Sequence, residues 1–134
     1  MDEQIAQYLE VHSCDETLSR HARVMEGLRR AGIDTMRVIV KNRSGSWQAQ
    51  GLELDYAVGG SSCDDVIAEF AQSLALTIDD HLRIHGHIGH IVRAAQPDVW
   101  SAFFDGVVKE TLEMKRDLLT EFSIPAWVYV EKAA

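Results

Sequence analysis

Apolar residues recur every three or four positions over residues 62–85, and this spacing predicts the longest helix of the chain. Ser62 and Asp65 suit its start, because a serine side chain can accept a hydrogen bond from a backbone N–H of the first turn. Gly86 and Gly89 favour its end. A wide apolar stripe indicates that the helix covers one face of a sheet. The stripe consists of Val66, Ile67, Phe70, Ala71, Leu74, Ile78 and Leu82.

Alternating apolar and polar residues before this helix predict a hairpin and a third short strand. Residues 35–41 form the first strand, and residues 42–45 contain the Asn, Ser and Gly that a tight turn requires. A third strand is expected at residues 55–58, ending in a Gly-Gly turn at 59–60. One face of the first strand presents Met36, Val38 and Val40, and one face of the second presents Trp47, Ala49 and Gly51.

A second helix and a last strand are expected in the C-terminal part, residues 97–131. Pro97 suits the first helical position, and Pro125 would stop the helix. The β-branched and aromatic run at 126–131 predicts a strand that returns to the sheet, within one subunit or across a dimer. The apolar stripe of the helix consists of Val99, Trp100, Phe103, Phe104, Val107, Val108, Thr111 and Leu112.

The first 33 residues read as a helical N-terminal arm. Ser13 to Glu16 has the form of a capping box. Leu18, Ala22, Met25 and Leu28 then recur at helical spacing, and Gly32 favours a stop.

These elements predict one α+β domain over residues 1–134, comprising the 1–33 arm, a 35–85 core and the 97–131 segment. A chain of 134 residues with 46% hydrophobic and 25% charged residues suits one globular domain. The net charge of −8 argues against a nucleic-acid surface, which needs clustered Lys and Arg. The acidic N-terminus shows no signal peptide, and no apolar run approaches the ~18 residues of a membrane span. We expect a soluble, cytoplasmic protein without a membrane partner.

The segment from Trp47 to Ile78 resembles the core of the HicB antitoxin family, including solitary HicB-like proteins that carry no DNA-binding module. The resemblance rests on Trp47, Ala49, Leu52, Glu53, Leu54 and Asp55, then Gly60, Ser62, Asp64, Asp65, Phe70 and Leu74. It implies a small antiparallel sheet in the order β-β-β-α-β, similar to a HicB or double-stranded-RNA-binding fold. It also implies a bacterial toxin–antitoxin context.

The resemblance implies a binding protein and no enzyme or cofactor. The expected function is to sequester or regulate a basic partner protein, a toxin nuclease being one candidate, as part of an oligomer. Sequence-specific nucleic-acid binding is not expected, because the C-terminal segment has no recognition-helix pattern. Two alternatives stay open: an accessory or inhibitory component of a bacterial or phage conflict system, and a histidine-cluster metal-binding protein or enzyme.

Four of the six histidines fall between residues 81 and 90, and this cluster has metal-ligand chemistry. His81 and His85 are four residues apart and so share a helical face, while His87 and His90 could fold over from the following loop. Adventitious nickel or zinc binding is the competing interpretation, because the cluster matches no recognised metal motif.

The partner-binding candidates are Trp47, Glu53, Asp55 and Trp127. Glu53 and Asp55 are two residues apart and would point to the same face of a strand. Trp47 lies beside a turn and Trp127 on an expected edge strand, where an exposed tryptophan would mark an association surface.

Overall fold

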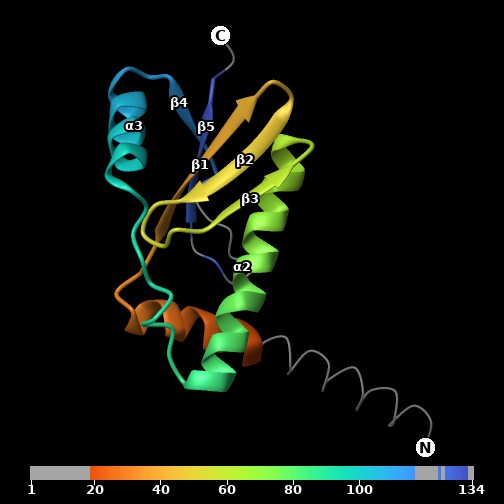
Figure 1. Ribbon diagram of the computed structural model, residues 1–134, viewed down its shortest axis with the longest axis vertical. Helices are drawn as coiled ribbons and strands as arrows, with labels where there is room; N and C mark the ends of the chain where they lie inside the picture. The colour runs from red at the N-terminus through yellow and green to blue at the C-terminus, as the bar shows by residue number, and fades with distance from the viewer. Residues whose placement is uncertain (1–18, 117–123, 125, 133–134) are drawn as a thin grey trace, which may run out of the picture.

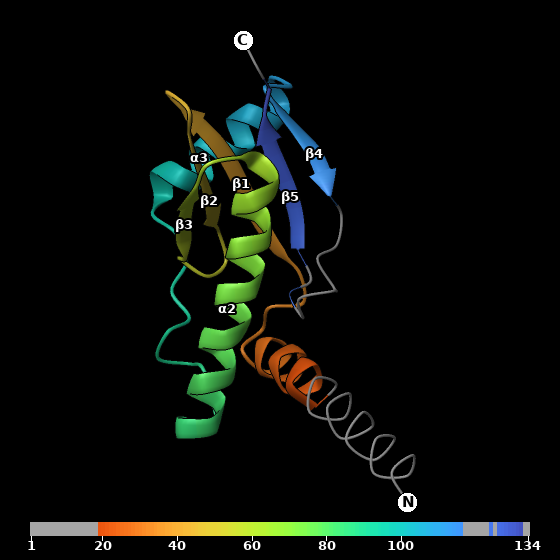
Figure 2. The same ribbon diagram turned by 90° about the vertical axis from the view of Figure 1, so that its right-hand side faces the viewer.

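In a computed structural model of the protein, residues 19–116, 124 and 126–132 are described. The sheet has five strands in the order β3-β2-β1-β5-β4, with α2 against one face and α3 against the other (Figure 1, Figure 2). The α+β class is therefore confirmed. In chain order, the elements are a helix at residues 19–30, called here the N-terminal helix, β1 (Met36–Arg43), β2 (Ser46–Gly51), β3 (Ala57–Gly60), α2 (Cys63–His85), α3 (Pro97–Val108), β4 (Leu112–Arg116) and β5 (Ala126–Glu131).

The expected antiparallel sheet was wrong in two respects. β5 lies at the expected residues, but it pairs with β1 in parallel, so the sheet is mixed. β4 adds a further strand that pairs antiparallel with β5. Alternating apolar residues specify which face of a strand is buried, but they do not specify the direction of its neighbour.

The main core lies between the sheet and α2, as the apolar stripe predicted. Ser62 caps α2 by accepting a hydrogen bond from the Asp65 backbone N–H (3.1 Å), and Gly86 ends the helix in a left-handed conformation. None of the described helices is long and apolar enough to cross a membrane. The expected stripe and strand faces are buried together: Met36, Val38, Val40, Ala49, Val66, Ile67, Phe70, Ala71, Leu74 and Ile78.

The hairpin turn agrees with prediction, whereas the Gly-Gly turn was wrong. Ser44 and Gly45 have positive φ angles, and the Gly45 N–H donates to the Asn42 side chain (3.0 Å). Gly59 and Gly60 instead lie inside β3. A Cβ on Gly60 would lie 3.2 Å from Cβ of Val66, so this glycine allows the first turn of α2 to approach the strand closely.

A second, smaller core lies under α3 on the opposite face, where Phe103 packs with Ile39 and Leu52. The expectation that the helix continues through Leu112 was wrong. α3 ends at Val108, Glu110 has a positive φ angle, and Leu112 belongs to β4. A Cβ on Gly106 would lie 2.6 Å from Cγ of Leu112, so Leu112 packs back on the helix and extends the apolar pattern beyond the helix end.

The N-terminal helix lies across the end of α2, where α2 extends past the sheet (Figure 2). The expected stripe was partly wrong, because Val24 and Leu28 are buried while Ala22 is exposed. A Cβ on Gly27 would lie 2.8 Å from Cδ1 of Leu82, so the glycine sets the contact face between the two helices. The expected capping box at Ser13 to Glu16 lies outside the described residues, as does Pro125.

Asp79 of α2 is the one buried charged residue in the described part of the chain. Its carboxylate accepts a hydrogen bond from Nε of Arg23 (2.9 Å) and lies 3.5 Å from Nε of Arg20. Arg83, one turn further along α2, also faces it at 3.6 Å. A buried carboxylate is tolerated only when it has such partners, so Asp79 ties the N-terminal helix to α2.

Replacing Asp79 with alanine should lower the free energy of unfolding by about 1–3 kcal/mol, because charge-assisted hydrogen bonds between the two helices are lost. Denaturant unfolding of the full chain measures this change. Asp80→Ala is the matched control, with the same gain in helix propensity at the neighbouring position. The Asp80 side chain is 60% exposed and pairs only with Arg83 among the described ion pairs, so its loss should cost less than about 0.5 kcal/mol. Equal effects would contradict the role of Asp79.

Gly51, at the end of β2, is expected to tolerate no side chain. Its Cβ would lie 2.6 Å from the backbone oxygen of Leu54 and 2.8 Å from Cε of Met36. Gly51→Ala should therefore lower the free energy of unfolding by about 1–3 kcal/mol through overpacking. A Cβ on Gly59 would meet nothing closer than 3.7 Å, so Gly59→Ala should change stability by less than about 1 kcal/mol. Thermal melts of both variants measure the difference, and a stable Gly51→Ala protein would refute it.

Candidate functional site

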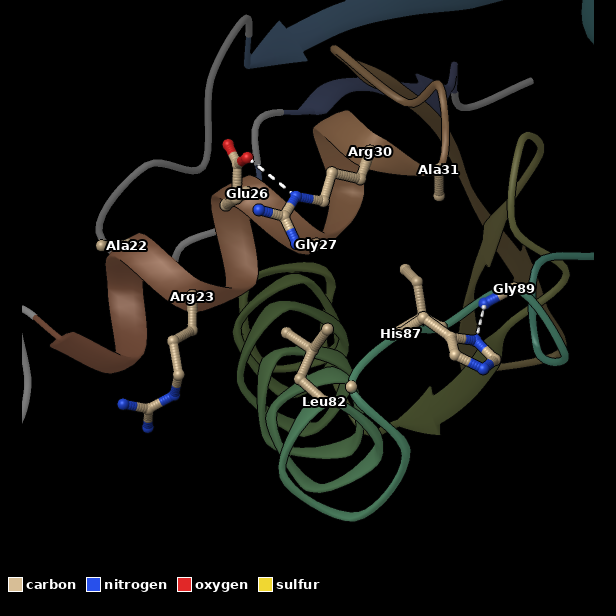
Figure 3. Close-up of a pocket in the computed structure, with 11 residues that line it drawn as sticks. Ala22, Arg23, Glu26, Gly27, Arg30, Ala31, Leu82, His87 and Gly89 are labelled. Carbon is tan, nitrogen blue, oxygen red and sulfur yellow. Dashed lines mark hydrogen bonds and ion pairs between the residues drawn. The ribbon is translucent and has the colours of Figure 1, made fainter.

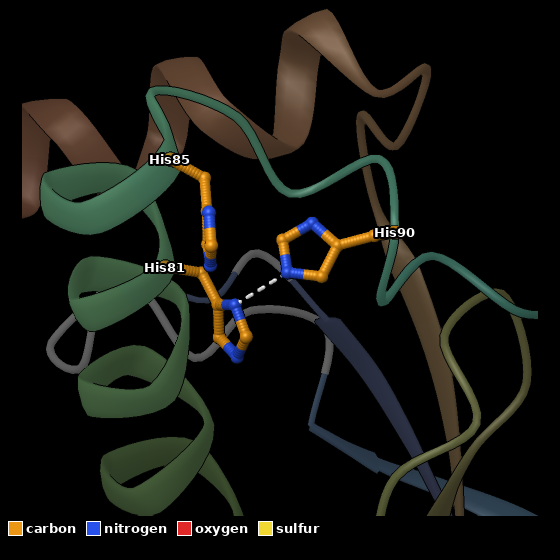
Figure 4. A group of neighbouring side chains, drawn as sticks. All are labelled: His81, His85 and His90. Carbon is orange, nitrogen blue, oxygen red and sulfur yellow. Dashed lines mark hydrogen bonds between the residues drawn. The ribbon is translucent and has the colours of Figure 1, made fainter.

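Three of the four predicted metal-ligand histidines lie together at the end of α2. His81 and His85 point from successive turns of the helix toward His90, which comes from the following loop (Figure 4). One ring nitrogen of each lies within 4.8 Å of the others. Nδ1 of His81 and Nε2 of His90 are 2.7 Å apart and share one hydrogen bond. We call these three residues the histidine cluster.

The loop that positions His90 is anchored on both sides of it. Gly86 reverses the chain with a φ angle of 79°, a conformation that favours glycine. Ile88 is 1% exposed and belongs to the main core. Its carbonyl accepts hydrogen bonds from the N–H groups of Ile91 (3.0 Å) and Val92 (3.2 Å). His90 is therefore held within a closed turn beside α2.

His87 lies next to the cluster but does not belong to it. Its Nδ1 accepts a hydrogen bond from the Gly89 backbone N–H (3.2 Å), and its ring centroid is 5.5 Å from that of His90. The pKa of His90 is lowered, first by partial desolvation and then by repulsion from His85, His81 and His87. Both effects favour the neutral imidazole, which is the form that binds metal ions.

The same loop forms one wall of a pocket of about 670 Å³ beneath the N-terminal helix (Figure 3). Leu82 and Ile88 contribute apolar surface, and His87 lines the pocket from the loop after α2. Arg23 and Arg30 bring positive charge from the N-terminal helix.

Both guanidinium groups at this pocket already have carboxylate partners. Arg23 binds Asp79, and Nε of Arg30 donates to Glu26 at 3.0 Å. Hydrogen bonds from Arg29 and then from Arg30 outweigh desolvation and lower the pKa of Glu26 to about 2. Glu26 is thus ionised at neutral pH and compensates Arg30. The pocket therefore suits an apolar group better than an ion.

Glu53 and Asp55 do not share the face of a strand, because β2 ends at Gly51 and both lie in the loop before β3. The Gly51 N–H donates to Tyr56 O (2.8 Å), which closes this loop. Glu53 accepts hydrogen bonds from the backbone N–H and the guanidinium of Arg37, each at 2.6 Å. Glu53 is therefore bound within the protein, whereas Asp55 is exposed and accepts a hydrogen bond from Gln50 (2.8 Å).

The two tryptophan candidates lie on opposite faces of the sheet. Trp47 is half-buried against the main core on the α2 face. Trp127 is paired with Arg37 in the β1–β5 register and is 38% exposed. The structure thus does not bring the four partner-binding candidates together in one surface.

Sequence reasoning missed an exposed apolar surface on α3. Phe104, Val107 and Val108, called here the α3 surface, are 53%, 40% and 81% exposed. Their spacing of three and four residues places them on one side of the helix. The signal was present in the sequence, because the apolar stripe of α3 is too wide for one buried face.

Comparisons with known proteins give no match: no protein-family model matches the chain, no curated protein matches its sequence, and no solved structure matches its fold. The HicB-like assignment stays a prediction from the residues between Trp47 and Leu74.

Proposed function

We propose that this protein is a HicB-like, non-enzymatic binding module that sequesters or regulates a basic partner protein. A small toxin nuclease is the class of partner that the resemblance implies. The observation that supports the proposal is the α3 surface, where three apolar side chains are exposed on one side of a helix. Exposed apolar surface bordered by polar residues is typical of sites where another protein docks.

Aromatic packing makes this surface a suitable anchor. Phe104 stacks on Trp100 with ring centroids 6.0 Å apart and contacts Phe103 edge-on at 5.4 Å. Phe103 is buried and contacts Tyr129 of β5 at 4.8 Å. The exposed ring is therefore supported by rings from the core, and rigid aromatic anchors lose little conformational entropy on binding.

The charge around the α3 surface favours a basic partner over an acidic one. α3 contains two acids and no basic residue, and Lys109, which follows the helix, pairs with Asp105 at 3.1 Å. The whole chain has a net charge of −8, which would accelerate encounter with a positively charged protein. The two acids of α3 are Asp98 and Asp105.

Phe104→Ser combined with Val108→Ser should abolish partner retention, because interface energy concentrates in a few apolar anchors. Immobilised wild-type protein and the double variant would be compared in native lysate treated with nuclease. We expect the wild type to retain one stoichiometric basic protein, which increasing salt releases, and the variant to lose it at least 10-fold. Circular dichroism would verify that the variant is folded.

Ile84→Ser is the matched control, since Ile84 is an exposed apolar residue (74%) on α2. It should retain the partner as the wild type does. Equal retention by the wild type and the double variant would refute the proposal. Light scattering detects the competing outcome: if the wild type is an oligomer and the double variant a monomer, the α3 surface joins copies of this chain.

A further inference from the structure

We propose that His81, His85 and His90 bind a divalent transition-metal ion, with zinc as the ion that the ligand chemistry favours. Imidazole nitrogen suits zinc, copper, nickel and iron, and zinc accepts three histidine ligands with a fourth position open. The three ring nitrogens already lie within 4.8 Å of one another. This site is independent of the α3 surface and does not rest on the proposed function.

Small ring rotations bring the ligands to coordination distance. Tetrahedral zinc with Zn–N bonds of 2.0–2.1 Å requires its ligand nitrogens to be roughly 3.4 Å apart. His81 Nδ1 and His90 Nε2 are now 2.7 Å apart and must separate, while ring nitrogens farther apart, all within 4.8 Å, must approach one another. His85 and His90 are exposed, so their rings can rotate without displacing the core. The metal would replace the shared hydrogen bond between His81 and His90.

The backbone that carries the ligands is already in place. His81 and His85 lie one turn apart on a helix whose C-terminal end is capped by Gly86. His90 is fixed by the turn that the buried Ile88 anchors. Metal binding would therefore cost little conformational entropy. This distinguishes a preformed site from histidines that meet by chance on a mobile segment.

His87 stands apart from the three ligands, although it lies on the same loop as His90. His87 already accepts the Gly89 N–H through Nδ1, so we assign three protein ligands. The fourth position is left for water or an exchangeable ligand.

The test uses tag-free, full-length protein titrated with zinc in competition with a chromophoric chelator. We expect one ion per chain and a dissociation constant below about 1 µM. His90→Ala should weaken binding by at least ~100-fold, since even loss of an outer-shell partner costs 10–100-fold. The control His21→Ala removes a histidine outside the cluster and should bind as the wild type does. A dissociation constant above about 10 µM, or equal binding by both variants, would indicate an adventitious ion only and overturn the proposal.

Cobalt substitution gives a second readout that does not depend on affinity. Four-coordinate Co²⁺ absorbs strongly in the visible range, whereas six-coordinate hydrated Co²⁺ absorbs weakly. We expect strong visible bands for the wild type and for His21→Ala, and their loss in His90→Ala with an unchanged circular dichroism spectrum. Weak bands in the wild-type protein would refute a three-histidine site.

Discussion

The length of α2 is the constraint on which the rest of the structure depends. With 23 residues it is about 35 Å long at 1.5 Å per residue, whereas the eight residues of β1 span about 26 Å. The end of α2 extends past the sheet, so its apolar stripe needs a second cover there (Figure 2). The N-terminal helix supplies it through the close approach of Gly27 to Leu82, and Arg23 neutralises the buried Asp79. The end of α2 that extends past the sheet also carries His81 and His85.

The elements that sequence reasoning predicted correctly are those whose burial is periodic. α2, β1 and β5 each place their apolar residues at the spacing of a helix or a strand, and Ser62 and Pro97 mark helix starts through local chemistry. The errors concern contacts between distant segments. The parallel pairing of β1 with β5 joins segments more than 80 residues apart, and no local pattern encodes its direction. The predicted helix was too long, because Leu112 packs against α3 from β4 and so continues the apolar spacing of the helix.

Only part of the histidine cluster could be predicted from the sequence, because only the pair on α2 follows from local spacing. The spacing of His81 and His85 places both on one helical face in any α-helix. His90 joins them only because Gly86 reverses the chain and Ile88 is buried. Both features depend on the tertiary structure. His87 is closer to α2 in sequence but accepts the Gly89 N–H instead. Glu53 shows the opposite case, in which an attractive binding candidate proves to be the internal partner of Arg37.

The loop that carries His90 continues directly into α3, so the two proposed surfaces are joined along the chain. The loop is nevertheless fastened before α3 begins. Ala95 is buried and its N–H donates to Leu52 O (2.8 Å), while the Asp55 N–H donates to Arg93 O (2.5 Å). A ligand shifts a distant surface only through an element with two alternative arrangements. With Ile88 fixed on one side of His90 and Ala95 on the other, a metal ion would order only the short stretch between them. The histidine cluster and the α3 surface would therefore work independently of each other.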